Sequence, residues 1–270
     1  MWSRTEGVYS LTVTILAKLH RFVAVIGICL TCFSPSAHAA PLTQYKTTIT
    51  VSAAASLNQA FTELGKQFEK LNPSINIRFN FASSSSLVSQ IQSGAPADVF
   101  AAADLASFDK LLTSGNIVKS PRVFARNSMQ LVVKPGNPLG IRSVNDLGRA
   151  SIISLCAKTI PCGVYAASVL SRYGLTLLES NISRGVDATA TLNAVSTGDA
   201  DAAIVYATDA LSARKLVTVV TIPSAKNVKA MYGIGEIRGG KNIRQANQFI
   251  AFVLSQSGQK VLASFGFLAP

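Results

Sequence analysis

The chain has 270 residues, of which 49% are hydrophobic and 14% are charged. This length favours two domains, and the composition excludes an intrinsically disordered chain and a coiled coil. Lysine and arginine outnumber aspartate and glutamate by 25 to 13, which gives a formal net charge of +12. The basic residues are dispersed and are not interleaved with aromatic ones, so nucleic acid is not an expected partner.

The first 39 residues have the pattern of a cleavable secretory signal. Basic residues precede the apolar stretch 22–33, and Ala37 and Ala39 follow it at the spacing of a signal-peptidase site. The apolar stretch is shorter than the roughly 20 residues that a membrane-spanning helix needs. We therefore expect residues 1–39 to be removed and the rest of the chain to be exported as a soluble protein.

Export would change the chemistry that the chain can perform. Both histidines, His20 and His38, lie in the predicted signal, so Ser-His or Cys-His catalysis and imidazole metal sites are not expected in the exported part. Two cysteines remain there, Cys156 and Cys162. In an oxidising compartment such a pair is read most simply as a disulfide that closes a small loop. A two-cysteine metal site without other ligands is the weaker alternative.

From residue 47 onward, short apolar runs alternate with helical patterns. The expected strands are 47–52, 75–81, 97–102, 129–134, 151–155, 202–206, 216–221 and 231–236. The expected helices are 57–71, 86–93, 104–113, 163–173, 188–197, 207–213 and 241–264. This alternation predicts an α/β fold with mainly parallel sheets flanked by helices.

Two short polar segments, Ser120–Asn127 and Thr221–Lys229, separate apolar strands and are the expected crossovers between two lobes. The first lobe would then be discontinuous, with residues 45–123 plus 228–270, and the second lobe would be residues 124–227. Two lobes joined by short segments form a hinge, and the cleft between them is the expected ligand site.

Two of the predicted strands end in alanine and serine just before a helical pattern. The first junction reads ITVSAAASL and contains Ser56, and the second reads IRFNFASSSSL and contains Ser84. The first N–H groups of a helix have no acceptor within the helix and lie at the positive end of its dipole, so both junctions are candidate anion sites. Taken singly, each serine is explained more simply as an ordinary helix cap, because serine is a preferred residue at that position.

Three later segments resemble these junctions. In IPCGVY, the backbone around Cys162 precedes a helix; in VDAT, Asp187 is a candidate cap and Ala188 offers only its N–H; in AIVYATDA, Tyr206 ends a strand. Each segment alone fits capping or core packing. Together, however, the five junctions between strand and helix contain no lysine or arginine, since the one basic residue in these segments, Arg78, lies within the preceding strand. This indicates an enclosed site that holds an anion through neutral donors.

Six segments, in order along the chain, strongly resemble the periplasmic molybdate-binding proteins of ABC importers. They read AAASL, FASSSSL, GAPADVF, IPCGVYA, AIVYATDA and, near the end, FGF. The resemblance covers essentially the whole chain after the predicted signal. It implies a two-lobed, type II periplasmic binding protein that closes on molybdate or tungstate, is not an enzyme and needs no cofactor.

The resemblance also implies the ligand set. The oxyanion would be held by the hydroxyls of Ser56 and Ser84, by backbone N–H groups at Cys162 and Ala188, and by the hydroxyl of Tyr206. Relatives often have alanine at the position of Cys162, a change that need not remove a backbone donor. Molybdenum would be bound only as the oxyanion, with no protein ligand on the metal.

The implied partners are an inner-membrane ABC permease and its ATPase, served by a monomeric receptor in the periplasm. A site of donors only would select against hydrogen phosphate, and a cavity of the size of molybdate would select against the smaller sulfate. Two alternatives stay open at this point. One is a receptor for another tetrahedral oxyanion or a small organic acid, and the other is an exported hydrolase that uses Ser84 or Ser85.

Overall fold

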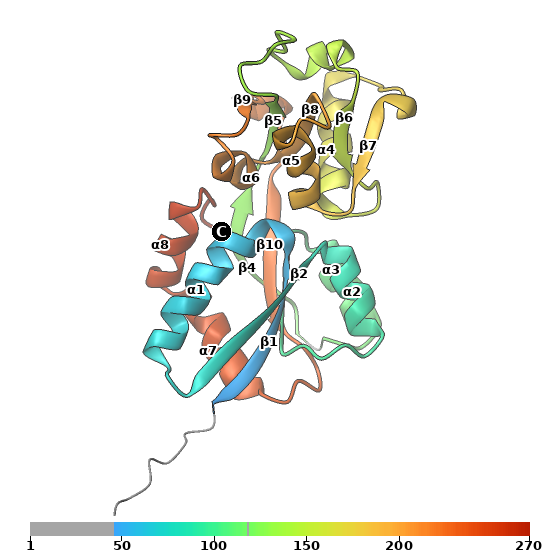
Figure 1. Ribbon diagram of the computed structural model, residues 1–270. Coiled ribbons are helices and arrows are strands. Elements are labelled where there is room, and N and C mark those ends of the chain that lie inside the picture. The colour runs from blue at the N-terminus through green and yellow to red at the C-terminus, as the bar shows by residue number, and fades with distance from the viewer. Residues whose placement is uncertain (1–45, 118) are drawn as a thin grey trace, which may run out of the picture. The chain divides into compact units, whose positions relative to one another are not determined.

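The computed structural model describes residues 46–270 apart from residue 118 (Figure 1). The predicted secretory signal, residues 1–39, lies outside the described residues. Two five-stranded sheets organise the described part of the chain, and helices flank both. None of the helices in this part combines the length and the apolar character needed to cross a membrane.

The first sheet has the strand order β2-β1-β3-β10-β4. Strand β1 is parallel to β2 and β3, whereas β10 is antiparallel to β3 and β4. The strands are β1 (Thr47–Ala54), β2 (Ile75–Ala82), β3 (Val99–Ala102), β4 (Arg122–Asn127) and β10 (Ala230–Glu236). The accompanying helices are η1 (Ala55–Leu57), α1 (Asn58–Leu71), α2 (Ser84–Gln92), α3 (Ala106–Thr113), α7 (Ile243–Leu254) and α8 (Gln256–Ser264).

The second sheet has the order β7-β6-β8-β5-β9 and repeats this pattern, with β5 as its antiparallel strand. Its strands are β5 (Met129–Val133), β6 (Ile153–Cys156), β7 (Ile182–Gly185), β8 (Ala202–Tyr206) and β9 (Thr218–Val220). Its helices are η2 (Val144–Arg149), α4 (Pro161–Tyr173), η3 (Glu179–Asn181), α5 (Ala188–Ser196), α6 (Ala207–Ser212) and η4 (Ser224–Lys226). The predicted two-lobed α/β fold with mainly parallel sheets is confirmed.

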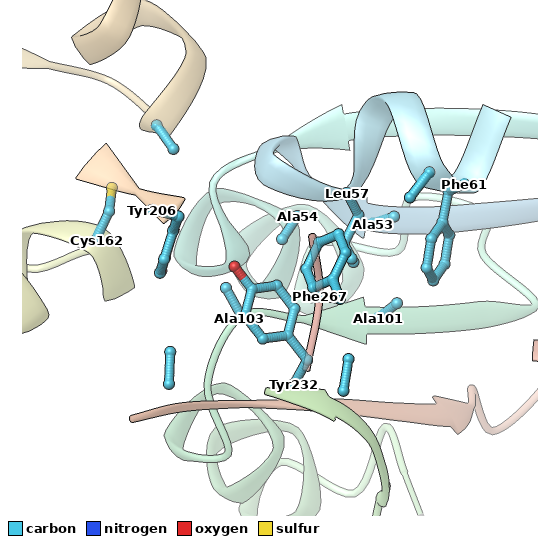
Figure 2. Packing of buried hydrophobic residues seen from close by; sticks show 14 of the residues in the cluster. Ala53, Ala54, Leu57, Phe61, Ala101, Ala103, Cys162, Tyr206, Tyr232 and Phe267 are labelled. Atoms are coloured by element: carbon cyan, nitrogen blue, oxygen red, sulfur yellow. The ribbon is translucent and has the colours of Figure 1, made fainter. Parts of the chain in front are cut away.

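Aromatic side chains fill the core between the first sheet and its helices. Phe61 of α1 has no exposed surface (Figure 2). Its ring centroid lies 5.6 Å from that of Phe124 and 6.0 Å from that of Phe249. Burying a phenylalanine of this kind stabilises the fold by about 2 to 3 kcal/mol. Because α1 is anchored in this way, the β1–η1 junction at its start has a fixed position.

The elements differ from the predicted ones at three places. Strands β4 and β7 are not among the predicted strands. The single helix expected over residues 241–264 is two helices, because Ser255 has extended backbone and its hydroxyl accepts a hydrogen bond from the N–H of Gly258 to cap α8. The chain passes from β4 in the first sheet to β5 in the second through Ser128 alone, and it returns between β9 and β10.

Candidate functional site

One small cavity brings together all five residues of the predicted ligand set. Ser56 lies in η1 after β1, Ser84 and Ala188 are the first residues of α2 and α5, Cys162 is the second residue of α4, and Tyr206 is the last residue of β8. The remaining residues of its wall are Ala54, Ala55, Ser83, Ala103, Pro161 and Asp187. The wall therefore takes residues from both sheets, at the ends where parallel strands lead into helices, which is where α/β proteins bind ligands.

The cavity is narrow. About 10 Å³ of it is open to the centre of a water-sized sphere, which is close to the least that one bound water needs. Two hydrogen bonds join the part of the chain around the first sheet to the part around the second. The Ser85 hydroxyl donates to the carbonyl of Thr159 at 3.2 Å, and the Tyr165 hydroxyl donates to the carbonyl of Ala103 at 3.4 Å. The site in this form fits a ligand of only a few atoms.

Tyr206 supplies a donor that nothing else in the described chain uses. The side chain is 1% exposed, and its hydroxyl has no hydrogen-bond partner among the described residues. Its ring packs against those of Tyr165 and Tyr232, with centroids 6.2 Å and 5.8 Å away. Figure 2 shows Tyr206 next to Tyr232. Burial, with the neighbouring tyrosines, raises the pKa of Tyr206 well above its ordinary value, so the phenol keeps its proton.

The hydroxyls of both serines have hydrogen-bond partners within the protein. The backbone N–H of Ala103 donates to Oγ of Ser84 at 3.0 Å, and Oγ of Ser56 lies 2.9 Å from the hydroxyl of Tyr232. Neither serine caps a helix. Ser83 caps α2 instead, by accepting from the N–H of Ser86, so α2 begins two residues before the predicted start at residue 86. The capping explanation therefore fails for both serines.

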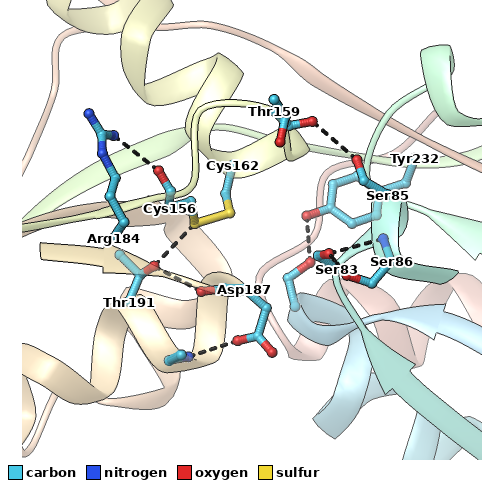
Figure 3. Close-up of a disulfide and its surroundings, with 12 residues drawn as sticks. Ser83, Ser85, Ser86, Cys156, Thr159, Cys162, Arg184, Asp187, Thr191 and Tyr232 are labelled. Atoms are coloured by element: carbon cyan, nitrogen blue, oxygen red, sulfur yellow. Dashed lines mark hydrogen bonds between the residues drawn. A yellow bond between two sulfur atoms is a disulfide. The ribbon is translucent and has the colours of Figure 1, made fainter. Parts of the chain in front are cut away.

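The predicted disulfide between Cys156 and Cys162 is present, with 5.8 Å between the two Cα atoms (Figure 3). It joins the end of β6 to the first turn of α4. On its β6 side, Arg184 donates to the carbonyl of Cys156 at 3.1 Å, and the Thr191 hydroxyl donates to the Cys156 sulfur at 3.2 Å. The disulfide thus fixes the loop that carries the N–H of Cys162 to β6, and the two hydrogen bonds hold Cys156 itself in place.

Gly163 allows the loop before α4 and the first turn of the helix to pack closely together. Its own N–H donates to the carbonyl of Ile160 at 2.9 Å. A Cβ at this position would lie 2.0 Å from the carbonyl oxygen of Ala157, so only glycine allows the first turn of α4 to pack so closely on the preceding loop.

Asp187 caps α5, as the sequence predicts. Its carboxylate accepts from the N–H of Ala190 at 2.8 Å, and its carbonyl accepts from the N–H of Thr191 at 3.1 Å. The N–H of Ala188 belongs to the first turn, where no acceptor exists within the helix. The N–H of Cys162 likewise lies in the first turn of α4 and has no acceptor within that helix.

The cavity is polar without basic side chains. Among the described residues that line it there is no lysine or arginine, and Asp187 is the one charged residue. The starts of η1, α2, α4 and α5 meet there instead, and each contributes partial positive charge. No group of three or more His, Cys, Asp or Glu side chains in residues 46–270, apart from 118, could hold a metal ion. The arrangement suits an anion held by neutral donors.

Sequence reasoning missed two residues that support the cavity wall without lining it. Tyr232, fully buried in β10, contacts Ser56, and Asn127 at the end of β4 contacts Tyr232 in turn. Both lie in segments that sequence patterns describe only as a strand or a crossover. A buried tyrosine needs a partner for its hydroxyl, but the sequence does not say which one.

Comparisons with known proteins agree with this fold. The family model described as "Bacterial extracellular solute-binding protein" matches residues 49–268. The molybdate-binding protein ModA of Mycobacterium tuberculosis is 40% identical over 238 residues, which are 88% of this chain and 90% of that protein.

Two solved structures are similar along nearly their whole length. One is the substrate-binding domain of a putative molybdenum ABC transporter from Clostridium difficile, with a TM-score of 0.63 and 26% identity over 83% of this chain and 100% of that one. The other is the periplasmic molybdate-binding protein of Azotobacter vinelandii, with a TM-score of 0.75 and 21% identity over 82% of this chain and 99% of that one. The chain belongs to the bacterial extracellular solute-binding protein family.

Proposed function

We propose that this protein is a receptor that binds molybdate in the cavity between its two sheets and delivers it to an ABC importer. The observation that carries the proposal is the Tyr206 hydroxyl, a buried donor without a partner in the described chain, in the wall of a cavity that holds no basic side chain. A buried donor of this kind costs about 1 to 3 kcal/mol unless a ligand accepts from it. The name of the mycobacterial relative supports molybdate as that ligand.

The proposed ligand set is the hydroxyls of Ser56, Ser84 and Tyr206 and the N–H groups of Cys162 and Ala188. All five donors come from the wall of one cavity. Each hydrogen bond from a neutral donor to an ion contributes roughly 1.5 to 3 kcal/mol, and the four helix starts offset the negative charge. The metal would be bound only through its oxygens.

The size of the cavity favours a compact oxyanion over an organic acid. The cavity has a volume of about 220 Å³, and an organic acid would need additional room for its carbon chain. Tungstate has nearly the same size and charge as molybdate, so we propose that it binds as well. Sulfate is smaller and would leave some donors unpaired.

We further propose that the two sheets are the two lobes of a hinged receptor, close to the predicted division at residues 123/124 and 227/228. We place the first crossing at Ser128, because β4 before it belongs to the first sheet and β5 after it belongs to the second. In this scheme the receptor is a monomer in the periplasm, opens about the two crossings to admit the anion, and presents the closed form to the permease and its ATPase.

The alternative of an exported hydrolase has less support. The Ser84 oxygen accepts from the N–H of Ala103 rather than contacting a base, and the sequence after residue 38 contains no histidine. A nucleophilic serine needs an adjacent general base. We therefore propose binding and release of the anion without catalysis.

A thermal-shift screen of the purified protein against molybdate, tungstate, sulfate, phosphate and chromate tests the proposal. We expect molybdate and tungstate to give the largest shifts, because a ligand that binds only the folded state raises the melting temperature. Ser89, exposed on the same helix as Ser84, supplies the control: Ser84→Ala should reduce the molybdate shift and Ser89→Ala should not. A larger shift with another anion would redirect the proposal to that anion.

A further inference from the structure

Two hydrogen bonds between the lobes use hydroxyls that are outside the proposed ligand set. Tyr165 of α4 donates to the carbonyl of Ala103, which follows β3 of the first sheet. In the opposite direction, Ser85 of α2 donates to the carbonyl of Thr159, which lies between β6 and α4. Each bond has its donor in one lobe and its acceptor in the other. Both bonds must therefore break when the lobes separate.

The acceptor of the Tyr165 hydroxyl lies just beyond the end of a strand pair. The pairing of β3 with β10 ends at Ala102 and Gly233, so Ala103 is the first residue after it. The N–H of Ala103 donates to Oγ of Ser84, and its carbonyl accepts from Tyr165. One residue of the first lobe thus connects a serine of the proposed ligand set to a tyrosine of the second lobe.

Tyr165 is the donor in this contact. Burial, together with the carboxylate of Asp104, raises the pKa of Tyr165 to about 12, against an opposing effect of the Met231 backbone. The phenol is therefore protonated at neutral pH, and a carbonyl oxygen can only accept. The Tyr165 ring packs on the ring of Tyr206, with centroids 6.2 Å apart. Replacing Tyr165 with phenylalanine would remove the hydrogen bond and keep this packing.

The acceptor of the Ser85 hydroxyl lies in the loop that the disulfide closes. Thr159 stands between Cys156 and Cys162 in the chain, and Figure 3 shows the Ser85 hydroxyl directed toward its carbonyl. The surroundings of this bond are exposed, whereas those of the Tyr165 bond are partly buried. Water therefore competes more strongly with the Ser85 bond, and Tyr165 makes the larger contribution.

Building on the proposed function, we propose that Tyr165 and Ser85 are positioning residues that form a latch, which holds the lobes closed and sets the rate at which the bound anion leaves. Neither residue lines the cavity, so the latch does not distinguish one anion from another. The anion enters the open form, in which both bonds are broken, so the rate of binding does not depend on them. The latch acts on release alone.

The test measures release and binding separately. Protein loaded with radiolabelled molybdate is diluted into an excess of unlabelled molybdate, and the loss of bound label gives the rate of release. Calorimetry gives the affinity, from which the rate of binding follows. We expect Tyr165→Phe to release molybdate about three- to tenfold faster, because the closed form loses one hydrogen bond, and to bind it at an unchanged rate. Ser85→Ala should release it faster by about threefold or less.

Two further comparisons separate a latch from a contact with the anion. In the double variant, Tyr165→Phe with Ser85→Ala, the two increases in release rate should multiply, because one opening breaks both bonds. Release of labelled tungstate should accelerate by the same factors as release of molybdate, because neither side chain contacts the anion. The matched controls are Tyr173→Phe, at the last residue of α4, and Ser89→Ala, at an exposed position of α2. Both should leave the two rates unchanged.

An unchanged release rate in Tyr165→Phe would overturn the inference, as would a loss of affinity that comes from slower binding. Thermal unfolding of the empty variants is measured alongside, because a merely structural role would lower the melting temperature and leave the release rate as it is. If the unaltered protein binds neither molybdate nor tungstate, the proposed function fails, and this inference fails with it. If it binds them and the variants release them at the same rate, the inference alone fails.

Discussion

The ring of Tyr206 lies 5.8 Å from the ring of Tyr232, and the two hydroxyls differ in one respect. The Tyr232 hydroxyl contacts Ser56 and Asn127, whereas the Tyr206 hydroxyl has no partner among the described residues. Two buried tyrosines side by side therefore have different roles. Tyr232 is satisfied within the protein, and Tyr206 is available to a ligand.

Replacing Tyr206 with phenylalanine should separate ligand binding from stability. We expect molybdate affinity to weaken by about 1 to 3 kcal/mol, because one donor to the ion is lost. The empty protein should be as stable as before or more stable by about 1 kcal/mol, because a buried donor without a partner is removed. Calorimetry and urea unfolding measure the two quantities. Unchanged affinity would remove Tyr206 from the ligand set.

Replacing Ser84 with alanine should lower both affinity and stability. The substitution removes a hydroxyl from the cavity and leaves the N–H of Ala103 without its acceptor, a loss of about 1 to 3 kcal/mol in the free energy of unfolding. Ser89→Ala, at an exposed position of the same helix, should change neither. Full anion affinity in Ser84→Ala would revive the hydrolase alternative.

Opening the disulfide should loosen the loop that carries the N–H of Cys162. The variant Cys156→Ser/Cys162→Ser should lose roughly 2 kcal/mol of stability, as expected for a short closed loop, and bind molybdate several-fold more weakly. Urea unfolding and calorimetry check the two effects. If binding stays unchanged while stability falls, the disulfide has only a structural role.

Asp209 should make stability depend on pH. Burial, together with the charge of Asp187, raises its pKa from 3.8 to about 7, and one carboxylate oxygen has no partner in the described chain. Between about pH 4 and 7 the folded protein holds a proton that the unfolded chain has lost, so the free energy of unfolding falls as pH rises through this range. From pH 5 to pH 8 the decrease should be on the order of 2 to 3 kcal/mol.

Urea unfolding at pH 5 and pH 8 measures this decrease. The range is favourable because the sequence after residue 38 contains no histidine that would titrate there. The variant Asp209→Asn should show little dependence on pH between these values. An equal dependence in both proteins would mean that Asp209 ionises normally.

The sequence predicted the strands and helices that have strong apolar patterns, and it missed two of the four edge strands, β4 and β7. Strand β4 reads RVFARN and β7 reads ISRG, and each pairs with a neighbour on one side only. An edge strand carries polar and charged side chains because one side meets solvent. Its pattern therefore resembles a loop, and β4 was interpreted as a crossover.

For the candidate site, the sequence predicted the residues at the junctions of strands and helices, and all five lie in one cavity wall. It could not predict which residues contact these five without lining the cavity themselves. The contact between Ser56 and Tyr232 joins residues 176 positions apart, and no local pattern encodes such a pairing. The sequence also could not tell which serine of the run caps α2 and which one lines the cavity. Ser83 is the cap, whereas Ser84 accepts from the N–H of Ala103, a contact that exists only in the folded protein.

The most direct test of the account is calorimetric titration of the purified protein with molybdate, alongside Tyr206→Phe. The account predicts one molybdate per chain, with affinity in the variant lower by about 1 to 3 kcal/mol. Absence of molybdate binding by the unaltered protein would contradict it.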